Sequence, residues 1–329
     1  MLAMAADTTG HRLTAVQRAL PEVGAHDVLL RVLACGVCRT DLHLLDGDLP
    51  VHRPGVVPGH EVVGQVVAMG PRAHAFSLGE RVGVPWLGGT CGHCAYCASL
   101  RENLCDQPVF TGYDRDGGFA QYTAADERFC FSIPATYDDA HAAPLLCAGL
   151  IGFRAWALAG GHTPRRLGLY GFGAAAHVLC QLAVGQGQEV YAFTRDGDTS
   201  GQAFARTLGA VWAGGSGDAP PQPLDAALIF APVGDLVPAA LAATRKGGAV
   251  VCAGIHMSTI PAFEYRLLWG ERVVRSVANL TRADGHAFFS LLAEVPVRTH
   301  VQTFALGDAN DAVLALRGGN VNGAVVLIP

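Results

Sequence analysis

The sequence is short of charged residues and has no excess of positive charge. Only 16% of its 329 residues are Asp, Glu, Lys or Arg, whereas half are hydrophobic. The formal net charge is −5, and the 23 Lys and Arg residues are scattered along the chain. Disordered chains carry more charge and less apolar surface, and nucleic-acid-binding chains carry a basic patch. The composition therefore predicts a globular protein with no nucleic-acid partner, and the length predicts two domains.

A secretory signal and a membrane span are also lacking. Asp7 and Arg12 interrupt the N-terminal stretch before an apolar core of a signal peptide is complete. Residues 167–188 form a charge-free stretch of 22 residues, but it contains five glycines, three glutamines and a histidine. That composition is typical of a turn in a globular domain and not of a bilayer-spanning helix. We expect a cytoplasmic protein with no membrane partner, without internal repeats or long linkers.

Ten cysteines stand in a chain that we expect to stay in reducing surroundings, where disulfides are rare. Four of them fall within fifteen residues, in the pattern Cys91-x2-Cys94-x2-Cys97-x7-Cys105. Zinc takes four ligands in a tetrahedron, with zinc–sulfur distances of about 2.3 Å, and short Cys-x2-Cys loops supply them. We predict a structural zinc site; a metal-free cysteine-rich loop and a thiol redox centre are the alternatives. Four thiolates leave no coordination position open, so such a site braces a loop and performs no chemistry.

A catalytic zinc needs three protein ligands and one exchangeable position. Three other segments offer ligands: "ACGVCRTDLH" (34–43), "VPGHEVVG" (57–64) and "APLLCAG" (143–149). Taken alone, Cys38 and Cys147 are equally typical of buried core cysteines, and His60 of a core or capping histidine. Their spacing leaves these alternatives open.

The second half of the chain contains the pattern of a nucleotide-binding unit. The stretch "RRLGLYGFGAAAHVLCQLAVGQGQEVYAFTR" predicts a strand at 167–170, a glycine turn, a helix, and a strand at 189–193. Gly171 suits the tight turn, and Gly173, after Phe172, lets the backbone approach a pyrophosphate. Ala176 replaces the third glycine of the usual motif. The runs "LDAALIFAPVG" and "KGGAVVCAGI" predict further strands of a parallel sheet, and "PPQP" at 220–223 predicts a loop.

The choice of cofactor is predicted from the end of the second of these strands. An NAD-binding chain usually has an acidic residue there, which binds the ribose hydroxyls. This chain has Thr194 followed by Arg195, a hydroxyl and a guanidinium that suit a 2′-phosphate. Asp196 and Asp198 follow, and either offers a carboxylate to the ribose instead. The sequence therefore favours NADP(H), with NAD(H) as the alternative.

Taken together, these motifs resemble those of the zinc-dependent medium-chain alcohol dehydrogenases, of the compact bacterial type. The resemblance covers nearly the whole chain and includes, in the family's order, "GVCRTDLH", "PGHEVVGQVVAMG", "GERVGVPWLGGTCGHCAYC", "APLLCAG", "GLYGFGA" and "RKGGAVVCAGI". It implies an α/β fold with a GroES-like, β-rich catalytic domain over residues 1–147, to which the C-terminal residues 278–329 return. Residues 148–277 would form a Rossmann domain with a doubly wound parallel sheet.

The resemblance also implies roles for individual residues around the metal. Cys38, His60 and Cys147 match the catalytic zinc ligands, which leave the fourth position open. Glu61 matches an acid beside the metal. Asp41 matches a carboxylate that fixes the tautomer of the histidine ligand and raises its basicity.

Further residues match positions that serve the substrate, the proton and the cofactor. Thr40 and His43 match a proton relay, and Thr40 also contacts the substrate. Arg39 matches a residue that binds the cofactor pyrophosphate. Trp86 matches a position that narrows the substrate pocket, although a core Trp at a strand end is the alternative; Leu87 and Leu280 are vaguer candidates.

The activity that the resemblance implies is hydride transfer between a small or medium primary alcohol, or the matching aldehyde, and a nicotinamide cofactor. It also implies two zinc ions per chain and a homo-oligomer, tetramer or dimer. A zinc-independent quinone or enone reductase of the same fold is one alternative, and the ligand triad argues against it. A polyol or formaldehyde dehydrogenase is another, which the motifs do not separate. The four remaining cysteines are expected in the core: Cys35, Cys130, Cys180 and Cys252.

Overall fold

The computed structural model describes residues 1–7, 9, 11–319, 321 and 323–329. They divide into two compact units. The first unit comprises Met1–Cys147, Asn279–Phe289 and Thr299–Pro329, and the second comprises Ala148–Ala278 and Ser290–Arg298. All seven predicted metal ligands lie in the first unit, so each predicted metal site is contained within it.

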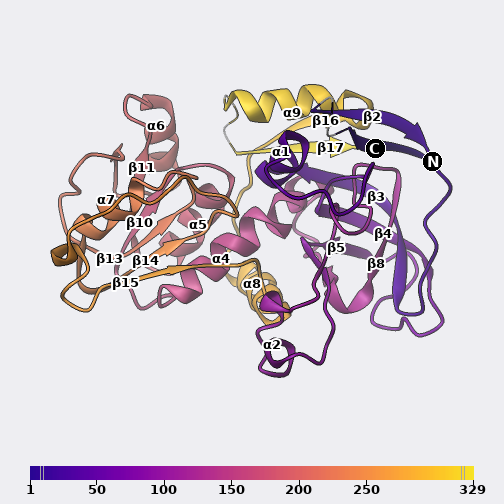
Figure 1. Cartoon of the computed structure of the whole chain (residues 1–329), viewed down its shortest axis with the longest axis horizontal. Coiled ribbons are helices and arrows are strands. Elements are labelled where there is room, and N and C mark those ends of the chain that lie inside the picture. The colour runs from indigo at the N-terminus through magenta and orange to yellow at the C-terminus, as the bar shows by residue number, and fades with distance from the viewer. Residues whose placement is uncertain (8, 10, 320, 322) are drawn as a thin grey trace. The chain divides into compact units, whose positions relative to one another are not determined.

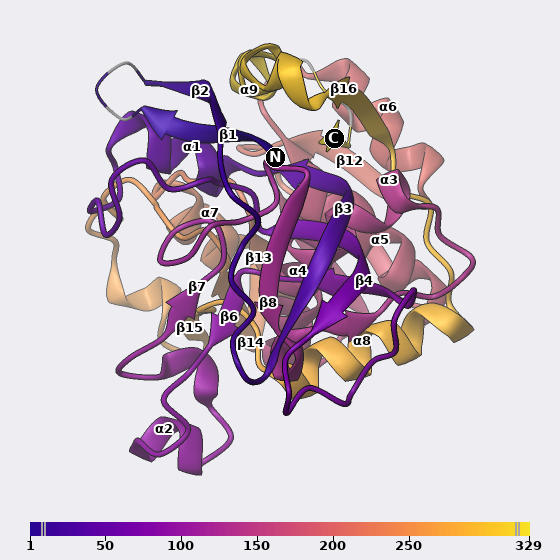
Figure 2. The ribbon, with the colours of Figure 1, turned by 90° about the vertical axis from the view of Figure 1, so that its right-hand side faces the viewer.

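A mostly antiparallel sheet forms the frame of the first unit. Its strands, in spatial order, are β16 (Val301–Ala305), β17 (Ala324–Ile328), β3 (Asp27–Val37), β4 (Glu61–Met69), β5 (Arg81–Val84) and β9 (Phe131–Ser132), with β8 (Tyr122–Asp126) also paired to β3. β16 and β17 run parallel and the other pairs antiparallel. Figure 2 shows β8, β3 and β4 side by side. The long strands β3 and β4 are rich in buried valines and leucines. Such side chains, valine above all, pack well on the half-buried surface of a pleated sheet.

Smaller elements of the first unit carry the candidate site. The two-stranded sheets are β1 (Leu2–Asp7) with β2 (Arg12–Gln17), and β6 (Leu87–Gly89) with β7 (Val109–Phe110). The helices are α1 (Arg39–Asp46), α2 (Ala95–Ala98), α3 (Asp139–Ala142) and α9 (Ala309–Gly318), with short 3-10 turns η1 (Glu102–Leu104), η2 (Glu127–Phe129), η3 (Ala143–Leu146) and η5 (Leu306–Asp308). The loop that bears α2 extends away from the strands of its unit (Figures 1 and 2).

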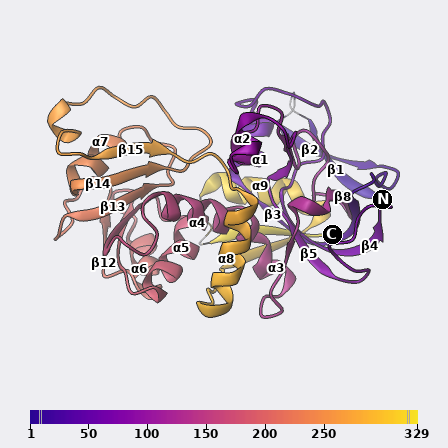
Figure 3. The same ribbon diagram turned by 90° about the horizontal axis from the view of Figure 1, so that it is seen from below.

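A six-stranded, fully parallel sheet forms the second unit. Its spatial order is β12 (Trp212–Gly215), β11 (Glu189–Thr194), β10 (Arg166–Tyr170), β13 (Leu224–Ile229), β14 (Thr244–Cys252) and β15 (Val273–Ser276). The other elements of this unit are α4 (Ala148–Leu158), α5 (Ala174–Gly185), α6 (Thr199–Thr207), α7 (Leu236–Ala243) and the 3-10 turn η4 (Tyr265–Leu267). Figure 3 shows β13, β14 and β15 as neighbours.

Strands are added on one side of β10 up to β12 and then on its other side from β13 onward, so the strand order reverses between β10 and β13. Nucleotides bind at this point in doubly wound folds. The predicted strand–turn–helix–strand unit is confirmed, with β10 starting one residue earlier and β11 ending one residue later than expected. Residues 220–223 lie in the loop between β12 and β13, as predicted. The predicted α/β class, with a Rossmann sheet in one unit and a β-rich sheet in the other, is therefore confirmed.

The C-terminal part differs in detail from the predicted continuous return of residues 278–329. Helix α8 (Arg282–Glu294) begins in the first unit and ends in the second, and Ser290–Arg298 belong to the second. Val295 packs directly against Gly185 of α5. A Cβ atom on residue 185 would lie only 2.3 Å from Val295 Cγ1, so a larger residue would not fit. Gln181 exchanges hydrogen bonds with the backbone of Arg298 at 2.8 and 2.9 Å. These contacts hold the segment 290–298 on α5.

The four cysteines predicted as core residues are all buried: Cys35, Cys130, Cys180 and Cys252. Among the described residues no single helix is long and apolar enough to cross a membrane. One bent pair of consecutive segments, Asp139–Leu146 and Ala148–Leu158, meets the length and composition requirement only when the two are taken together.

Candidate metal centres and active site

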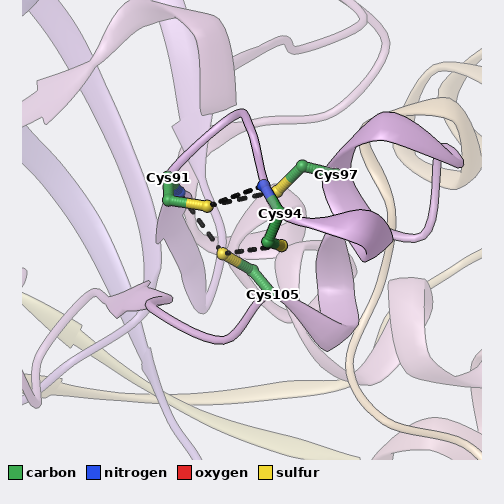
Figure 4. A group of neighbouring side chains, drawn as sticks. All are labelled: Cys91, Cys94, Cys97 and Cys105. Atoms are coloured by element: carbon green, nitrogen blue, oxygen red, sulfur yellow. Dashed lines mark hydrogen bonds between the residues drawn. The ribbon is translucent and has the colours of Figure 1, made fainter.

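The cysteines of the loop around α2 converge on a common centre. Figure 4 shows the four side chains pointing toward one another, and their sulfur atoms all lie within 4.8 Å of each other. The Sγ atoms of Cys91 and Cys97 are 4.0 Å apart, and those of Cys94 and Cys105 are 3.9 Å apart. Four sulfurs at the zinc–sulfur distance of about 2.3 Å occupy corners of a tetrahedron with edges of about 3.8 Å. The cluster therefore has the size and the ligand set of a zinc–tetrathiolate site.

Backbone N–H groups of the same loop point at these sulfurs. The N–H groups of Cys91 and Gln107 both donate to Cys105 Sγ at 3.3 Å, and that of Cys94 donates to Cys91 Sγ at 3.4 Å. Backbone N–H groups of Cys97 and Asp106 lower the pKa of Cys94 to about 6. Burial raises the pKa of Cys105 to about 11. Donors aimed at sulfur stabilise thiolates, which are the form that binds a metal.

A second group of potential ligands comes from three distant parts of the chain. Ligand atoms of Cys38, His60, Glu61 and Cys147 all lie within 4.8 Å of one another, and the two sulfurs are 3.8 Å apart. His60 is fully buried, and neither of its ring nitrogens has a hydrogen-bond partner among the described residues. An unpaired buried imidazole is costly in a folded protein. Two thiols and a buried imidazole without a hydrogen bond to the described residues, at this spacing, fit a zinc ion with three protein ligands.

The pairing of β3 with β4 brings these ligands together. Cys38 immediately follows β3, and Glu61 opens β4 opposite Gly36. A Cβ at Gly36 would lie 1.7 Å from Glu61 Oε2, so only glycine lets that carboxyl lie against β3. Gly59, at φ +97°, turns the chain into β4 beside Phe119. Cys147 lies between η3 and α4 and completes the group.

Asp41, the third residue of α1, joins two ligand-bearing segments. Its Oδ2 accepts the N–H of Cys38 at 2.8 Å, and its Oδ1 accepts the N–H of Gly59 at 3.2 Å. Oδ1 also lies 3.5 Å from His60 Nδ1. Burial lowers the pKa of His60, but the neighbouring carboxylate of Asp41 and the thiol of Cys38 outweigh burial and hold this pKa well above its usual value. The carboxylate of Asp41 therefore makes the neighbouring ring of His60 more basic.

The pKa values of the two thiols in this group are shifted in opposite directions. A hydrogen bond with Cys147 holds the pKa of Cys38 well below its usual value, and the same bond, with burial, raises the pKa of Cys147 well above it. Burial also raises the pKa of Glu61. The protons on Cys147 and His60 must leave before both bind a cation, so metal binding at this site releases protons.

Helix α1 carries the residues expected in the proton relay. Thr40 Oγ1 is 3.8 Å from Cys38 Sγ. His43, one turn along the helix, lies on the same face as Thr40, and its Nδ1 is 2.8 Å from Asp48 Oδ2. Arg39, the first residue of the helix, is exposed.

A wall of stacked rings adjoins the buried histidine. The ring of Trp86 meets that of His60 edge-on, with centroids 4.9 Å apart. Phe110 and Tyr113 stack on Trp86 at centroid distances of 4.9 and 5.7 Å. We call Trp86, Phe110 and Tyr113 the aromatic wall. The pairing of β6 with β7, which sets Leu87 opposite Phe110, holds it in place.

Phe110 and Tyr113 are not among the residues predicted from the sequence. Two aromatic residues around Gly112 are the only local signal, since the stacking depends on the β6–β7 pairing. Leu87 and Leu280, the vaguer candidates, are almost fully buried core residues.

The glycine turn after β10 has the features of a phosphate cradle. Gly171 has φ +86°, and a Cβ there would lie 2.8 Å from Ala231, so glycine is required. Nothing lies within 4 Å of the position of a Cβ at Gly173, which opens α5 without a side-chain cap. Uncapped N–H groups at a helix N-terminus bind anions. Ala176 is fully buried against the sheet, while Phe172 is half-buried beside Phe204.

The end of β11 presents an exposed basic side chain, Arg195, and an Asp198 carboxylate of which one oxygen caps the next helix. Thr194 is buried, and its hydroxyl donates to the carbonyl of Gly214 at 3.3 Å. The Arg195 side chain is exposed. Asp198 caps α6 by accepting the N–H of Gly201 at 2.8 Å. Asp196 Oδ1 lies against Gly215: a Cβ atom added to that glycine would be 2.5 Å from it.

Comparison with known proteins agrees with this geometry. Residues 24–135 match the family model "Alcohol dehydrogenase GroES-like domain". The chain is 46% identical over 322 residues to a probable alcohol dehydrogenase, AdhA, of Mycobacterium tuberculosis, which covers 96% of this chain and 92% of the relative.

Solved structures show the same fold along the whole chain. A cinnamyl alcohol dehydrogenase from Sorghum bicolor superposes with a TM-score of 0.91 at 27% identity, covering 99% of this chain and 97% of the other. A cobalt- and zinc-bound thermostable alcohol dehydrogenase from Pyrobaculum aerophilum superposes with a TM-score of 0.90 at 25% identity, covering 100% and 99%. On the combined agreement of sequence, ligand geometry and fold, this chain belongs to the medium-chain alcohol dehydrogenase family and is an oxidoreductase with alcohol dehydrogenase function.

Proposed function

We propose that the chain interconverts primary alcohols and aldehydes with a catalytic zinc held by Cys38, His60 and Cys147. The observation that carries the proposal is the convergence of these three side chains, with Glu61, within 4.8 Å in a buried part of the first unit. The three ligands leave a coordination position for an exchangeable partner. The zinc-bound relative from Pyrobaculum aerophilum supports the choice of metal.

A second zinc, bound by the four cysteines of the α2 loop, is part of the same proposal. The 3.9 and 4.0 Å spacings between its sulfurs support a tetrahedral site. With four thiolate ligands it has no open position, so its role is to fold the loop.

Zinc at the three-ligand site would supply the positive charge that makes an alcohol hydroxyl acidic, as it lowers the pKa of water from about 15.7 to about 7. The residues of the chain then do the rest. The carboxylate of Asp41 keeps the ring of His60 basic, and the thiolates of Cys38 and Cys147 would balance the two positive charges of the zinc. The hydroxyl of Thr40 takes the released proton and passes it to His43 on the same helix face. The nicotinamide cofactor supplies the hydride acceptor.

The aromatic wall is the reason to propose a substrate with a flat or slender carbon chain. Trp86 is fixed by stacking on Phe110 and Tyr113, so it narrows the approach to His60 without swinging aside. Offset stacking adds about 0.5–1.5 kcal/mol per ring pair to simple burial. We therefore propose small and medium primary alcohols, with aromatic ones included, as the substrates.

NADP(H) is the proposed cofactor. Arg195 offers an exposed guanidinium at the end of β11, while the carboxylate of Asp198 already caps α6. A guanidinium binds a phosphate with two parallel charge-assisted hydrogen bonds. The open space over Gly173 and the uncapped start of α5 support a pyrophosphate at the turn.

The chain is further proposed to be a cytoplasmic homo-oligomer, dimer or tetramer. In the described part of the chain, β15 pairs with β14 alone and leaves its other edge unpaired. Tyr265 and Trp269 nearby are 70% and 62% exposed, and Val273 of β15 is 51% exposed. An apolar edge strand invites pairing with another strand, and a second copy would cover it.

The experiment combines elemental analysis with a cofactor comparison. We expect two zinc ions per purified chain, and faster reduction of short and aromatic aldehydes with NADPH than with NADH. In Arg195→Ala the KM for NADPH should rise about tenfold, which corresponds to one charge-assisted hydrogen bond of about 1.5 kcal/mol, with the KM for NADH unchanged. Arg165→Ala, which removes another highly exposed arginine of the second unit, is the matched control.

Other outcomes would replace parts of the proposal. A single zinc per chain together with reduction of quinones or enones would favour the zinc-independent reductase. Faster turnover with NADH than with NADPH in both the wild type and Arg195→Ala would favour NAD(H).

A further inference from the structure

We propose that His52 and Asp114 are positioning residues that hold the aromatic wall in place and so set the width of the substrate that reaches His60. The proposal rests on the function proposed above and narrows its substrate class to unbranched and flat alcohols. Both residues belong to the first unit, and neither is among the residues predicted from the sequence.

Asp114 connects the aromatic wall with residues 49–53, a loop between α1 and β4. Its Oδ2 accepts the backbone N–H of Phe110 at 2.7 Å, and its own backbone N–H donates to the carbonyl of Phe110 at 2.9 Å. Its Oδ1 is 2.7 Å from Nδ1 of His52, which is the donor because a carboxylate only accepts. The carboxylate is therefore held by the wall on one side and fixes His52 on the other.

The ring of His52 covers Tyr113 on the outside of the wall. The centroids of these two rings are 4.4 Å apart, with an interplanar angle of 40°. The hydroxyl of Tyr113 donates to the carbonyl of Pro50, so the loop contacts both the ring and the hydroxyl of one side chain. Tyr113 is 5% exposed, whereas the side chain of His52 is 50% exposed. His52 is therefore the outermost ring in a series of ring contacts that reaches His60 through the aromatic wall.

Few other contacts hold the middle of this loop. Residues 49–53 are in neither a helix nor a strand, and the side chains of Val51 and Arg53 are exposed. The hydrogen bond from Arg53 to Asp116 is long, at 3.4 Å. A segment with few backbone hydrogen bonds and exposed side chains opens at a low free-energy cost. The contacts of His52 therefore have a large share in keeping the loop on the wall.

The position of Trp86 depends on these contacts through Tyr113. Trp86 narrows the approach to His60 as long as its stacking partners stay in place. Loss of the His52 ring uncovers one face of Tyr113 and releases the loop, so Trp86 moves aside at a lower cost. A substrate branched next to its carbinol carbon then gains room. Pockets that exclude a single extra methylene discriminate by roughly 10–200-fold, so a small displacement of Trp86 has a measurable effect.

A second histidine–carboxylate pair of the first unit provides the matched control. Nδ1 of His141 is 2.8 Å from the carboxylate of Asp138, and the side chain of His141 is 45% exposed. This pair lies at the start of α3, where Asp138 accepts the backbone N–H of His141. His141→Ala therefore removes the same kind of contact at the same exposure without altering the wall.

The test compares the wild type, His52→Ala, His52→Phe and His141→Ala as zinc-loaded full-length enzymes that oxidise n-butanol and neopentyl alcohol at a saturating nicotinamide cofactor. In His52→Ala we expect the ratio of kcat/KM for neopentyl alcohol to that for n-butanol to rise about tenfold. The change should fall on the KM for neopentyl alcohol, with kcat for n-butanol and the zinc content unchanged, because no metal ligand is altered. A merely structural role would lower the Tm and leave this ratio unchanged.

His52→Phe separates the ring contact from the hydrogen bond. It keeps a ring on Tyr113 but loses the donor to Asp114, so the same ratio should rise only about threefold. His141→Ala should match the wild type. A wild-type ratio in His52→Phe would overturn the part assigned to Asp114.

A double-mutant cycle with Trp86→Ala tests whether His52 acts through the wall. Trp86→Ala alone should raise the ratio of kcat/KM values, since it removes the ring that narrows the approach. Residues that act through a shared partner are not additive. In the Trp86→Ala background, His52→Ala should therefore change the ratio by less than about twofold. A full tenfold effect there would overturn the proposed action through the wall.

The remaining outcomes separate this inference from the proposed function. An unchanged ratio in His52→Ala together with a raised ratio in Trp86→Ala overturns the role of His52 and leaves the wall as the determinant of substrate width. An unchanged ratio in Trp86→Ala overturns the role of the wall and, with it, the inference. A wild type that lacks zinc at the three-ligand site, or that does not oxidise n-butanol, overturns the proposed function instead.

Discussion

The two cysteine-based centres of the first unit differ in how the chain builds them. The four cysteines of the α2 loop fall within fifteen residues and are arranged by backbone N–H groups of that loop. Cys38, His60 and Cys147 come from three elements and meet only because β3 and β4 pair and η3 ends beside them. The first centre is local, and the second is a product of the whole unit.

This difference matches the work each centre can do. The local centre uses thiolates alone and saturates the metal, so its geometry is set by a short loop that needs little support. The assembled centre mixes thiolates with a buried imidazole. Glu61 lies within 4.8 Å of these ligand atoms, and Asp41 accepts a hydrogen bond from the backbone of Gly59 next to His60. A reactive metal needs this outer support because a small displacement of one ligand changes both affinity and reactivity.

Removing one ligand from the assembled centre should have the largest effect. In Cys147→Ala we expect kcat for alcohol oxidation to fall at least about 1,000-fold, because the charge that makes the hydroxyl acidic is lost. Zinc should fall from two ions to one per chain, since the α2 loop keeps its own. Elemental analysis and steady-state kinetics on the same preparation give both numbers.

Cys180→Ala is the matched control for this variant. Cys180 is a fully buried cysteine of the second unit, far along the chain from either centre. Its loss should leave two zinc ions and nearly full activity. An active Cys147→Ala enzyme with one zinc would show that the assembled centre is not the catalytic one.

Removing one ligand from the local centre should act on stability and spare the chemistry. In Cys105→Ala we expect the loop to lose its zinc and the Tm to fall by about 3–4 °C, which corresponds to roughly 2–3 kcal/mol in a chain of this size. The kcat of the folded fraction at 25 °C should stay within about threefold of the wild type. Differential scanning calorimetry and kinetics below the transition measure the two separately. Lost activity at an unchanged Tm would instead give the local zinc a part in the reaction.

The same contrast explains what the sequence could predict. Cys91, Cys94, Cys97 and Cys105 were identifiable from spacing because the ligands lie on one loop. The strands β10 and β11 were identifiable to within one residue because the glycine turn and the apolar runs mark both ends. Both features depend on local sequence, which a pattern records directly.

Features that depend on contacts between distant segments were not predictable in this way. The stacking of Phe110 and Tyr113 on Trp86 requires the register of two short strands that are twenty residues apart. The attachment of residues 290–298 to the second unit follows from the fit of Val295 over Gly185. No periodicity or motif encodes either contact.

One buried carboxylate links the local centre to the rest of the unit and gives the smallest expected effect. Glu102, in η1 between the third and fourth cysteines, accepts the backbone N–H of Arg282 at 2.9 Å and its Nε at 3.3 Å. The guanidinium of Arg282 also lies over the ring of Phe129, 5.1 Å from its centroid. Glu102→Gln keeps an acceptor oxygen but loses the charge, so it should lower the free energy of unfolding at pH 7 by about 1–2 kcal/mol, part of the roughly 1.5–3 kcal/mol that a hydrogen bond to a charged group contributes.

The pH dependence of this effect follows from the pKa of Glu102. Burial raises this pKa, but the N–H and the guanidinium of Arg282 outweigh burial and lower it. A carboxyl with a lowered pKa stabilises the fold fully above its unfolded pKa of about 4.3, and this contribution is lost as the pH falls through the folded value. The difference between wild type and Glu102→Gln should therefore be constant from pH 7 to 5 and shrink below about pH 4. Urea unfolding at each pH measures it, with the exposed Glu294→Gln as control. A difference that persists at low pH would mean that the charge of Glu102 is not what attaches the loop to Arg282.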